Sequence, residues 1–116
     1  MKTLICKFTE KQLNNIKNVA ESLYFTFDSN KKDNYFNFSI SSPQNQDFEI
    51  EVNANNLKEL QEELYKFWDN YNVDDEAILW YGMDKGEPKS LKTLLKDMEW
   101  CKRISGRLYN KVNHIK

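Results

Sequence analysis

The side chains in this sequence that could most readily take part in binding or catalysis are carboxylates, and they are concentrated in its middle. Residues 47–87 hold twelve acidic residues and three lysines, a net charge of −9, whereas residues 1–46 carry +2 and residues 88–116 carry +6. Consecutive acids at 74–76 lack the alternating ligand spacing and central glycine of a calcium loop. A concentrated acidic band attracts a basic partner and repels nucleic acid, so the pattern favours binding over catalysis.

Groups that could act as a nucleophile or a general base are few. The one histidine, His114, lies two residues from the end, where a chain usually frays and cannot hold a base in register. Cys6 and Cys101 have no zinc-ligand spacing, and Cys101 falls on an apolar stripe, so we expect both to be reduced and buried. The three glycines are isolated and form no phosphate-binding loop. We therefore predict a protein that is not an enzyme, with no metal and no cofactor; a small hydrolase is the least favoured class.

The predicted partner-binding residues combine the acidic band with one aromatic side chain. Glu59, Glu62 and Glu63 share one side of an expected helix. Glu49 and Glu51 share one face of an expected strand. For most of the acids taken one by one, the solvated face of an ordinary helix is the favoured interpretation. The full predicted set is Tyr35, Glu49, Glu51, Glu59, Glu62, Glu63, Asp69, Asp74, Asp75 and Glu76.

The last quarter of the chain suggests an alternative partner. Lys96, Arg103 and Arg107 fall on one side of an expected final helix, where they could contact phosphates. That side could instead dock on the acidic band of the same chain, or lie in water. Because the whole chain carries a net charge of −1, we rank nucleic acid below a basic protein surface as the partner.

Helices are predicted at both ends of the chain. Thr9 and Gln12 have the spacing of a capping box at the start of a first helix. Three further helices are expected: one after Asn55 or Asn56, a short one that begins at 74–76, and a long one capped by Ser90. Their apolar stripes predict that Trp68 and Trp80 are substantially buried.

Alternating apolar residues predict three strands, over 24–28, 35–41 and 48–52, and residues 4–8 could add a fourth. One face of this sheet would be apolar. The other would carry Tyr24, Thr26, Tyr35, Asn37, Ser39, Glu49 and Glu51, a set suited either to recognition or to simple solvation. We therefore expect an α+β fold in the order helix, three strands, three helices, with a three-stranded antiparallel sheet covered on one face by helices.

Length and composition set the remaining expectations. A chain of 116 residues with 40% hydrophobic residues predicts a single domain over 1–116. Apolar runs are too short for a membrane span, and the first seven residues do not resemble a signal peptide, so we expect a cytoplasmic protein.

The segment 48–108 holds a series of five features: an acidic strand at 48–52, a Leu/Glu-rich helix at 57–65, the acidic cluster 74–76 before Leu79-Trp80, a Gly-x-Pro turn at 86–88, and a final helix in which Leu91 to Leu95 precede Asp97. In this series the segment resembles small accessory proteins encoded by phages and mobile elements of gut bacteria. The resemblance implies an accessory protein in the cytoplasm of a bacterial host cell, one that could block a host defence such as CRISPR by binding an effector. A carboxylate array could then mimic the phosphate charges of duplex DNA in a basic groove.

Overall fold

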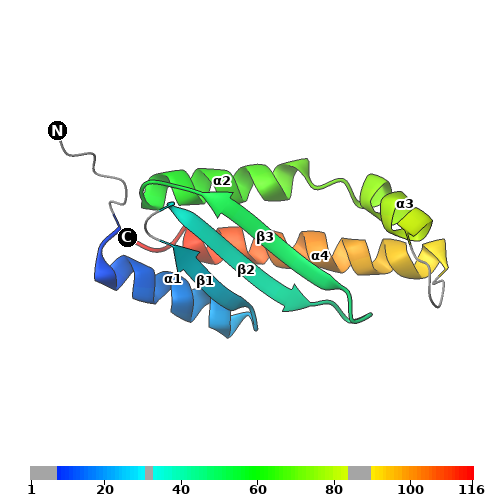
Figure 1. Ribbon diagram of the computed structural model, residues 1–116, viewed down its shortest axis with the longest axis horizontal. Helices are drawn as coiled ribbons and strands as arrows, with labels where there is room; N and C mark the ends of the chain where they lie inside the picture. The colour runs from blue at the N-terminus through cyan, green and yellow to red at the C-terminus, as the bar shows by residue number, and fades with distance from the viewer. Residues whose placement is uncertain (1–7, 31–32, 84–89) are drawn as a thin grey trace.

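The computed structural model describes residues 8–30, 33–83 and 90–116. Its elements are α1 (Glu10–Ser22), β1 (Thr26–Asn30), β2 (Tyr35–Ser41), β3 (Asp47–Asn53), α2 (Leu57–Asn70), α3 (Val73–Met83) and α4 (Leu91–Val112) (Figure 1). The predicted α+β order of one helix, three strands and three helices is confirmed. Residues 4–7 of the possible extra strand and the turn at 86–88 lie outside the described residues.

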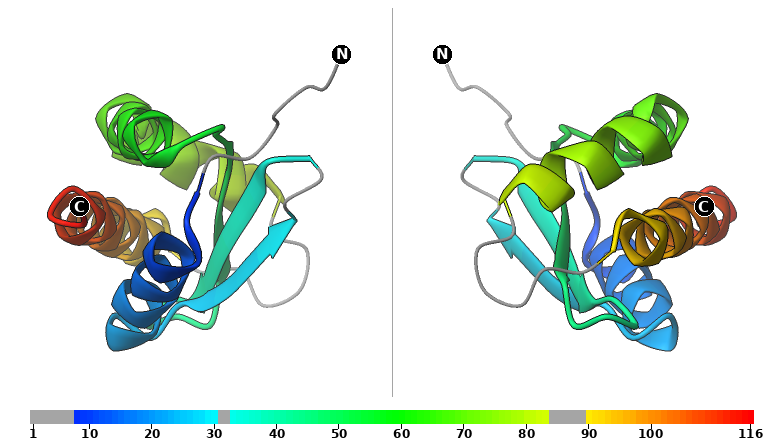
Figure 2. Two further views of the ribbon diagram at one scale, coloured as in Figure 1. Left: turned by 90° about the vertical axis from the view of Figure 1, so that its left-hand side faces the viewer. Right: turned by 90° about the vertical axis from the view of Figure 1, so that its right-hand side faces the viewer.

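The three strands form one antiparallel sheet in the order β1-β2-β3. Alternation along β2 and β3 places Phe36, Phe38 and Ile50 on the buried face. The helices gather on this face and leave the opposite face of the sheet open (Figure 2). The predicted sheet with one helix-covered face is therefore confirmed.

The first strand begins two residues later than the alternation predicts. Tyr24 has a φ of 70°, the left-handed conformation that commonly ends a helix, and its N–H donates to the carbonyl of Glu21 at 2.9 Å. The N–H of Phe25 donates to the carbonyl of Ala20 at 2.9 Å. These bonds tie Tyr24 and Phe25 to the end of α1, so ladder pairing with β2 starts at Thr26.

Side-chain caps fix where the helices begin. Thr9 Oγ1 accepts from the N–H of Gln12 at 3.0 Å, and Gln12 Oε1 accepts from the N–H of Thr9 at 3.1 Å, which is the predicted capping box. Asn56, rather than Asn55, caps α2, and Ser90 caps α4 as predicted. Each cap satisfies an N–H group that has no partner within its own helix.

The buried stripe of α4 runs the length of the core. Its apolar residues pack beneath the sheet and against α1, α2 and α3, and Ser105 interrupts them with a buried hydroxyl. That hydroxyl donates to the carbonyl of Lys102 at 2.7 Å, so its burial leaves the donor satisfied. Leu91, the first residue of the helix, lies outside this stripe and is 39% exposed.

Neither of the two tryptophans is fully buried, and both are half-buried. Trp68 stacks on Tyr109, with ring centroids 6.3 Å apart and an angle of 4° between the planes. Its indole covers Gly106 of α4, where an added Cβ would lie 2.7 Å from Trp68 Nε1. Trp68 therefore lies across the surface of the α2–α4 contact, where a glycine makes room for it, and not inside the core.

Helix α3 packs on the first half of α4. Ala77 is fully buried against Leu94 and Met98, whereas Ile78 and Leu79 are more than half exposed.

In the described part of the chain, no helix combines the length and apolar content needed to cross a membrane.

Candidate functional site

The open face of the sheet carries the predicted aromatic residue and two of the predicted carboxylates. The register aligns Asp28, Asn37 and Glu51 in one row across the three strands. Thr26, Ser39 and Glu49 form the next row. Asp47 and Tyr35 lie at opposite ends of this face. We call Asp28, Tyr35, Asn37, Asp47, Glu49 and Glu51 the acidic sheet face.

Asn37 organises the centre of the acidic sheet face. Its Nδ2 donates to Glu49 Oε1 at 2.9 Å and to the phenol oxygen of Tyr35 at 3.1 Å. Desolvation raises the pKa of Tyr35, and the neighbouring carboxylates of Glu51 and Glu49 raise it further. The phenol therefore stays neutral at pH 7.

A groove separates the free edge of β3 from α2 and α3. Two adjoining cavities of about 430 and 210 Å³ form it, and they share Phe67, Tyr71 and Glu76 as lining residues. Carboxylates reach its rim from three elements: Asp47, Glu49 and Glu51 of β3, Glu63 of α2, and Glu76 of α3. We call this feature the β3–α2 groove. It brings together four of the predicted partner-binding residues: Glu49, Glu51, Glu63 and Glu76.

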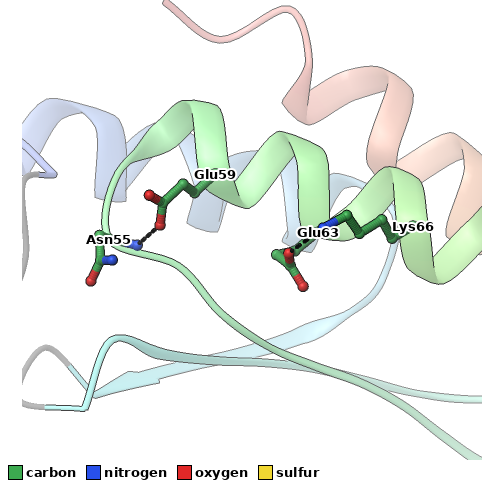
Figure 3. Close-up of polar contacts among 4 residues, drawn as sticks. All are labelled: Asn55, Glu59, Glu63 and Lys66. Atoms are coloured by element: carbon green, nitrogen blue, oxygen red, sulfur yellow. Dashed lines mark hydrogen bonds and ion pairs between the residues drawn. The ribbon is translucent and has the colours of Figure 1, made fainter.

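The other predicted carboxylates of α2 have different surroundings. Glu59 Oε1 accepts from the backbone N–H of Asn55 at 2.9 Å and so closes the cap of this helix (Figure 3). Glu63 pairs with Lys66 at 3.3 Å (Figure 3). Glu62 lines a separate cavity between α2 and α4, and Asp69 is exposed. Glu62 and Glu63 therefore border different surfaces, although they are adjacent in the chain.

The acidic cluster before α3 lies at the start of that helix. Asp74 and Asp75 are exposed in its first turn, and the N–H of Asp75 is capped by Asn72 Oδ1 at 2.9 Å. Carboxylates at this position interact favourably with the positive end of the helix dipole. Glu76 is the member of the cluster that reaches the β3–α2 groove.

The alternative nucleic-acid residues are accessible. Lys96, Arg103 and Arg107 are exposed, and among the described residues none of the three forms an ion pair. Arg103 shares a cavity with Trp68. The ring of Tyr109 stacks on that of Trp68 and meets that of Tyr65 edge-on, so aromatic rings adjoin Arg103 on this side of α4.

Lys102 does not belong to this basic surface, because its side chain caps the end of α2. Its ammonium donates to the carbonyls of Trp68 and Tyr71 at 2.8 and 2.6 Å. These carbonyls end α2, where a cation also complements the negative end of the helix dipole.

The nucleophile and base candidates lie apart from these surfaces or deep inside the protein. His114 is exposed after the end of α4, and its Nδ1 lies 2.7 Å from the carbonyl of Asn110. Cys101 is buried as predicted; burial, aided by the charge of Asp97, raises its thiol pKa to about 12. Cys6 lies outside the described residues. Over 8–30, 33–83 and 90–116, no group of three or more His, Cys, Asp or Glu side chains could hold a metal ion.

Of the carboxylates on the acidic sheet face, the predicted partner-binding set omitted two, Asp28 and Asp47. Asp28 lies outside the acidic band in sequence, and the register of the sheet places it in the same row as Glu51, with Asn37 between them. Its position in an alternating strand was the signal available.

A scan of protein-family models, a search of curated proteins and a search of solved structures find no match to this chain.

Proposed function

We propose that this protein is a non-catalytic binding protein that engages a basic protein surface through its acidic sheet face. The observation that carries the proposal is that four carboxylates, from Asp28, Asp47, Glu49 and Glu51, share a sheet face that no described helix covers. No described ion pair neutralises any of the four. A surface of this kind attracts Lys and Arg side chains and speeds association with a basic partner.

Two features suit the face to recognition. Asn37 holds Glu49 in place before a partner arrives, which lowers the entropy lost on binding. Tyr35 offers a rigid ring and a neutral hydroxyl, the combination that makes tyrosine common at protein interfaces.

The partner that we propose is the nucleic-acid-binding groove of a host defence effector, such as a CRISPR effector. This step rests on the sequence resemblance and on charge. Carboxylates two residues apart along a strand are about 7 Å apart, and neighbouring strands are about 5 Å apart. A two-dimensional array of that density could occupy a groove built for phosphates.

Affinity capture with matched variants tests the proposal. The wild-type protein, the variant Glu49→Gln/Glu51→Gln and the variant Lys96→Gln/Arg103→Gln/Arg107→Gln would each be used as bait in extracts of a bacterium that carries a defence effector. We expect the wild-type protein and the basic-side variant to retain a basic partner that the acidic-face variant loses. Retention of the same partner by the acidic-face variant would contradict the proposal.

One observation favours a second function, the binding of single-stranded nucleic acid. Arg103, which forms no ion pair among the described residues, shares a cavity with Trp68, whose ring stacks on that of Tyr109. A basic surface with aromatic rings is typical of such sites. Fluorescence anisotropy with labelled single-stranded DNA and RNA would detect it. Binding that is lost in the basic-side variant and kept in the acidic-face variant would favour this function over the first.

A further inference from the structure

The register of the sheet identifies which backbone groups of β3 point away from it. The N–H of Ala54 donates to the carbonyl of Asn34 at 2.9 Å, and the N–H of Ser42 donates to the carbonyl of Gln46 at 2.8 Å. Backbone groups alternate in direction along a strand, so the even-numbered residues of β3 pair with β2. The N–H and C=O groups of the odd-numbered residues therefore face the free edge, and these residues are Asp47, Glu49, Glu51 and Asn53.

This edge is a template for another strand. Within the described part of the chain, no hydrogen bond involves the backbone groups of Asp47, Glu49 or Glu51 on the side away from β2. Unpaired edge groups of this kind readily add a strand from another chain. The β3–α2 groove runs beside the edge, so an added strand would meet a hollow there.

The floor and the rim of the groove differ in chemistry. Phe67, Tyr71 and Trp80 line the floor and are half-buried, so they retain apolar surface that a strand could cover. Asp47, Glu49 and Glu51 place their carboxylates on the open face above the same edge. Among the lining residues of the two cavities, Lys66 is the single cation, and it is paired with Glu63.

We propose that the β3–α2 groove binds an extended basic segment of a partner protein, which adds to the edge of β3 as a fourth strand. This inference rests on the proposed function and specifies the form of the partner. Residues of the segment opposite Glu49 and Glu51 would exchange backbone hydrogen bonds with them and place Lys or Arg side chains beside their carboxylates. The alternate residues would be apolar and would lie over Phe67 and Tyr71.

Charge disfavours a second copy of this chain as the occupant. Antiparallel pairing of two β3 edges would place Asp47, Glu49 and Glu51 of one copy beside carboxylates of the other. Like charges opposite one another destabilise a strand pair. A basic segment has the complementary charge.

A synthetic peptide that alternates lysine with valine is the probe, titrated into the full chain and followed by calorimetry. Its control is the same peptide with N-methyl groups on the lysine backbone nitrogens, which keeps every charge and removes the edge-pairing donors. We expect the parent peptide to bind about tenfold or more tightly than the control. Equal affinity of the two peptides, or failure of the parent peptide to bind, would overturn strand addition.

Substitutions in the protein, in place of changes in the peptide, test the same β3 edge. Glu49→Pro removes an edge-facing N–H, and proline is tolerated at an edge position that has no ladder bond to lose. Glu49→Thr keeps the N–H and removes the carboxylate. Ser29→Pro removes the corresponding donor from the opposite, β1 edge, because Asp28 and Asn30 pair with β2 there.

We expect Glu49→Pro to lower the affinity for the parent peptide about tenfold more than Glu49→Thr does. Ser29→Pro should leave this affinity unchanged. Circular dichroism checks that each variant is folded; if Glu49→Pro unfolds, the comparison of the two peptides decides. Equal effects of Glu49→Pro and Glu49→Thr would overturn strand addition. So would a dimer of the free protein that Glu49→Pro abolishes, since the edge would then belong to a second copy.

The failures of the two proposals can be distinguished. If both peptides bind equally and Glu49→Gln/Glu51→Gln weakens both, the acidic sheet face binds basic partners by charge alone, and only strand addition fails. If the captured partner is retained by Glu49→Gln/Glu51→Gln, the proposed function itself fails.

Discussion

The hydroxyl of Ser42 donates a hydrogen bond of 2.7 Å to Asp97 Oδ2, between residues 55 positions apart in the chain. Ser42 Oγ also accepts from the backbone N–H groups of Gln44 and Gln46, at 3.3 and 3.0 Å. Both side chains are buried, with Asp97 2% exposed. The contact fastens the turn between β2 and β3, next to the acidic sheet face, to the first half of α4.

Ser42→Ala should therefore lower the free energy of unfolding. Because the variant leaves a buried carboxylate oxygen without its donor, we expect a loss of about 1–3 kcal/mol in urea denaturation. In an Asp97→Ala background the same change should cost less, since the carboxylate is gone. An equal cost in both backgrounds would show that the hydrogen bond is not the source of the effect.

Lys102→Met should also destabilise the protein, because it leaves the carbonyls of Trp68 and Tyr71 at the end of α2 without their cation. Hydrogen bonds to a charged group contribute about 1.5–3 kcal/mol, so we expect a loss in that range in urea denaturation. Lys96→Met is the matched control, since Lys96 is exposed on the same helix and has no ion pair among the described residues. Similar losses in the two variants would argue against a capping role for Lys102.

Tyr24→Gly should stabilise the protein and leave it folded. Tyr24 has a φ of 70°, a conformation that costs a residue with a Cβ about 1 kcal/mol and costs glycine almost nothing. Its side chain is 87% exposed, so the substitution removes little packing. Thermal denaturation checks the gain; a lower melting temperature would mean that the ring makes a stabilising contact after all.

The protein should lose stability in alkaline solution. Burial raises the pKa of the Cys101 thiol from 9.0 to about 12 and also raises the pKa of the Tyr71 phenol. Above pH 9 the unfolded chain releases the thiol proton while the folded chain keeps it, so the stability falls as the pH rises from about 9 to about 12. Urea denaturation at a series of pH values should show a shallower fall in Cys101→Ala than in the wild-type protein. Parallel curves for the two proteins would contradict this assignment.

Features that depend on residues near one another in the chain, such as helix caps and strand positions, could be predicted from the sequence. Thr9 and Gln12 cap the first helix, and alternating apolar residues define the strands, because caps and periodicity depend on near neighbours. Tyr24 shows the limit of this reasoning: it continues an alternating pattern, yet the backbone uses it to end α1.

Long-range relations were not predictable. A polar residue in a helix such as Asp97 is ordinarily exposed, and its burial depends on a serine that the fold brings from 55 positions away. In the same way, the convergence of Glu51, Glu63 and Glu76 on one groove depends on how β3, α2 and α3 pack together. The acidic band includes the carboxylates that line this groove. It did not predict that Glu59 accepts from the N–H of Asn55 while Glu63 pairs with Lys66.

The most direct test of the central claim is to map where a partner binds. Isotope-labelled protein would be titrated with the partner recovered by affinity capture, and amide chemical shifts would be followed by NMR. We expect the largest shift changes at Asn37, Glu49 and Glu51 on the acidic sheet face, with Arg103 and Arg107 unperturbed. Changes confined to Arg103, Arg107 and the neighbouring aromatic rings, with the sheet unperturbed, would contradict the account.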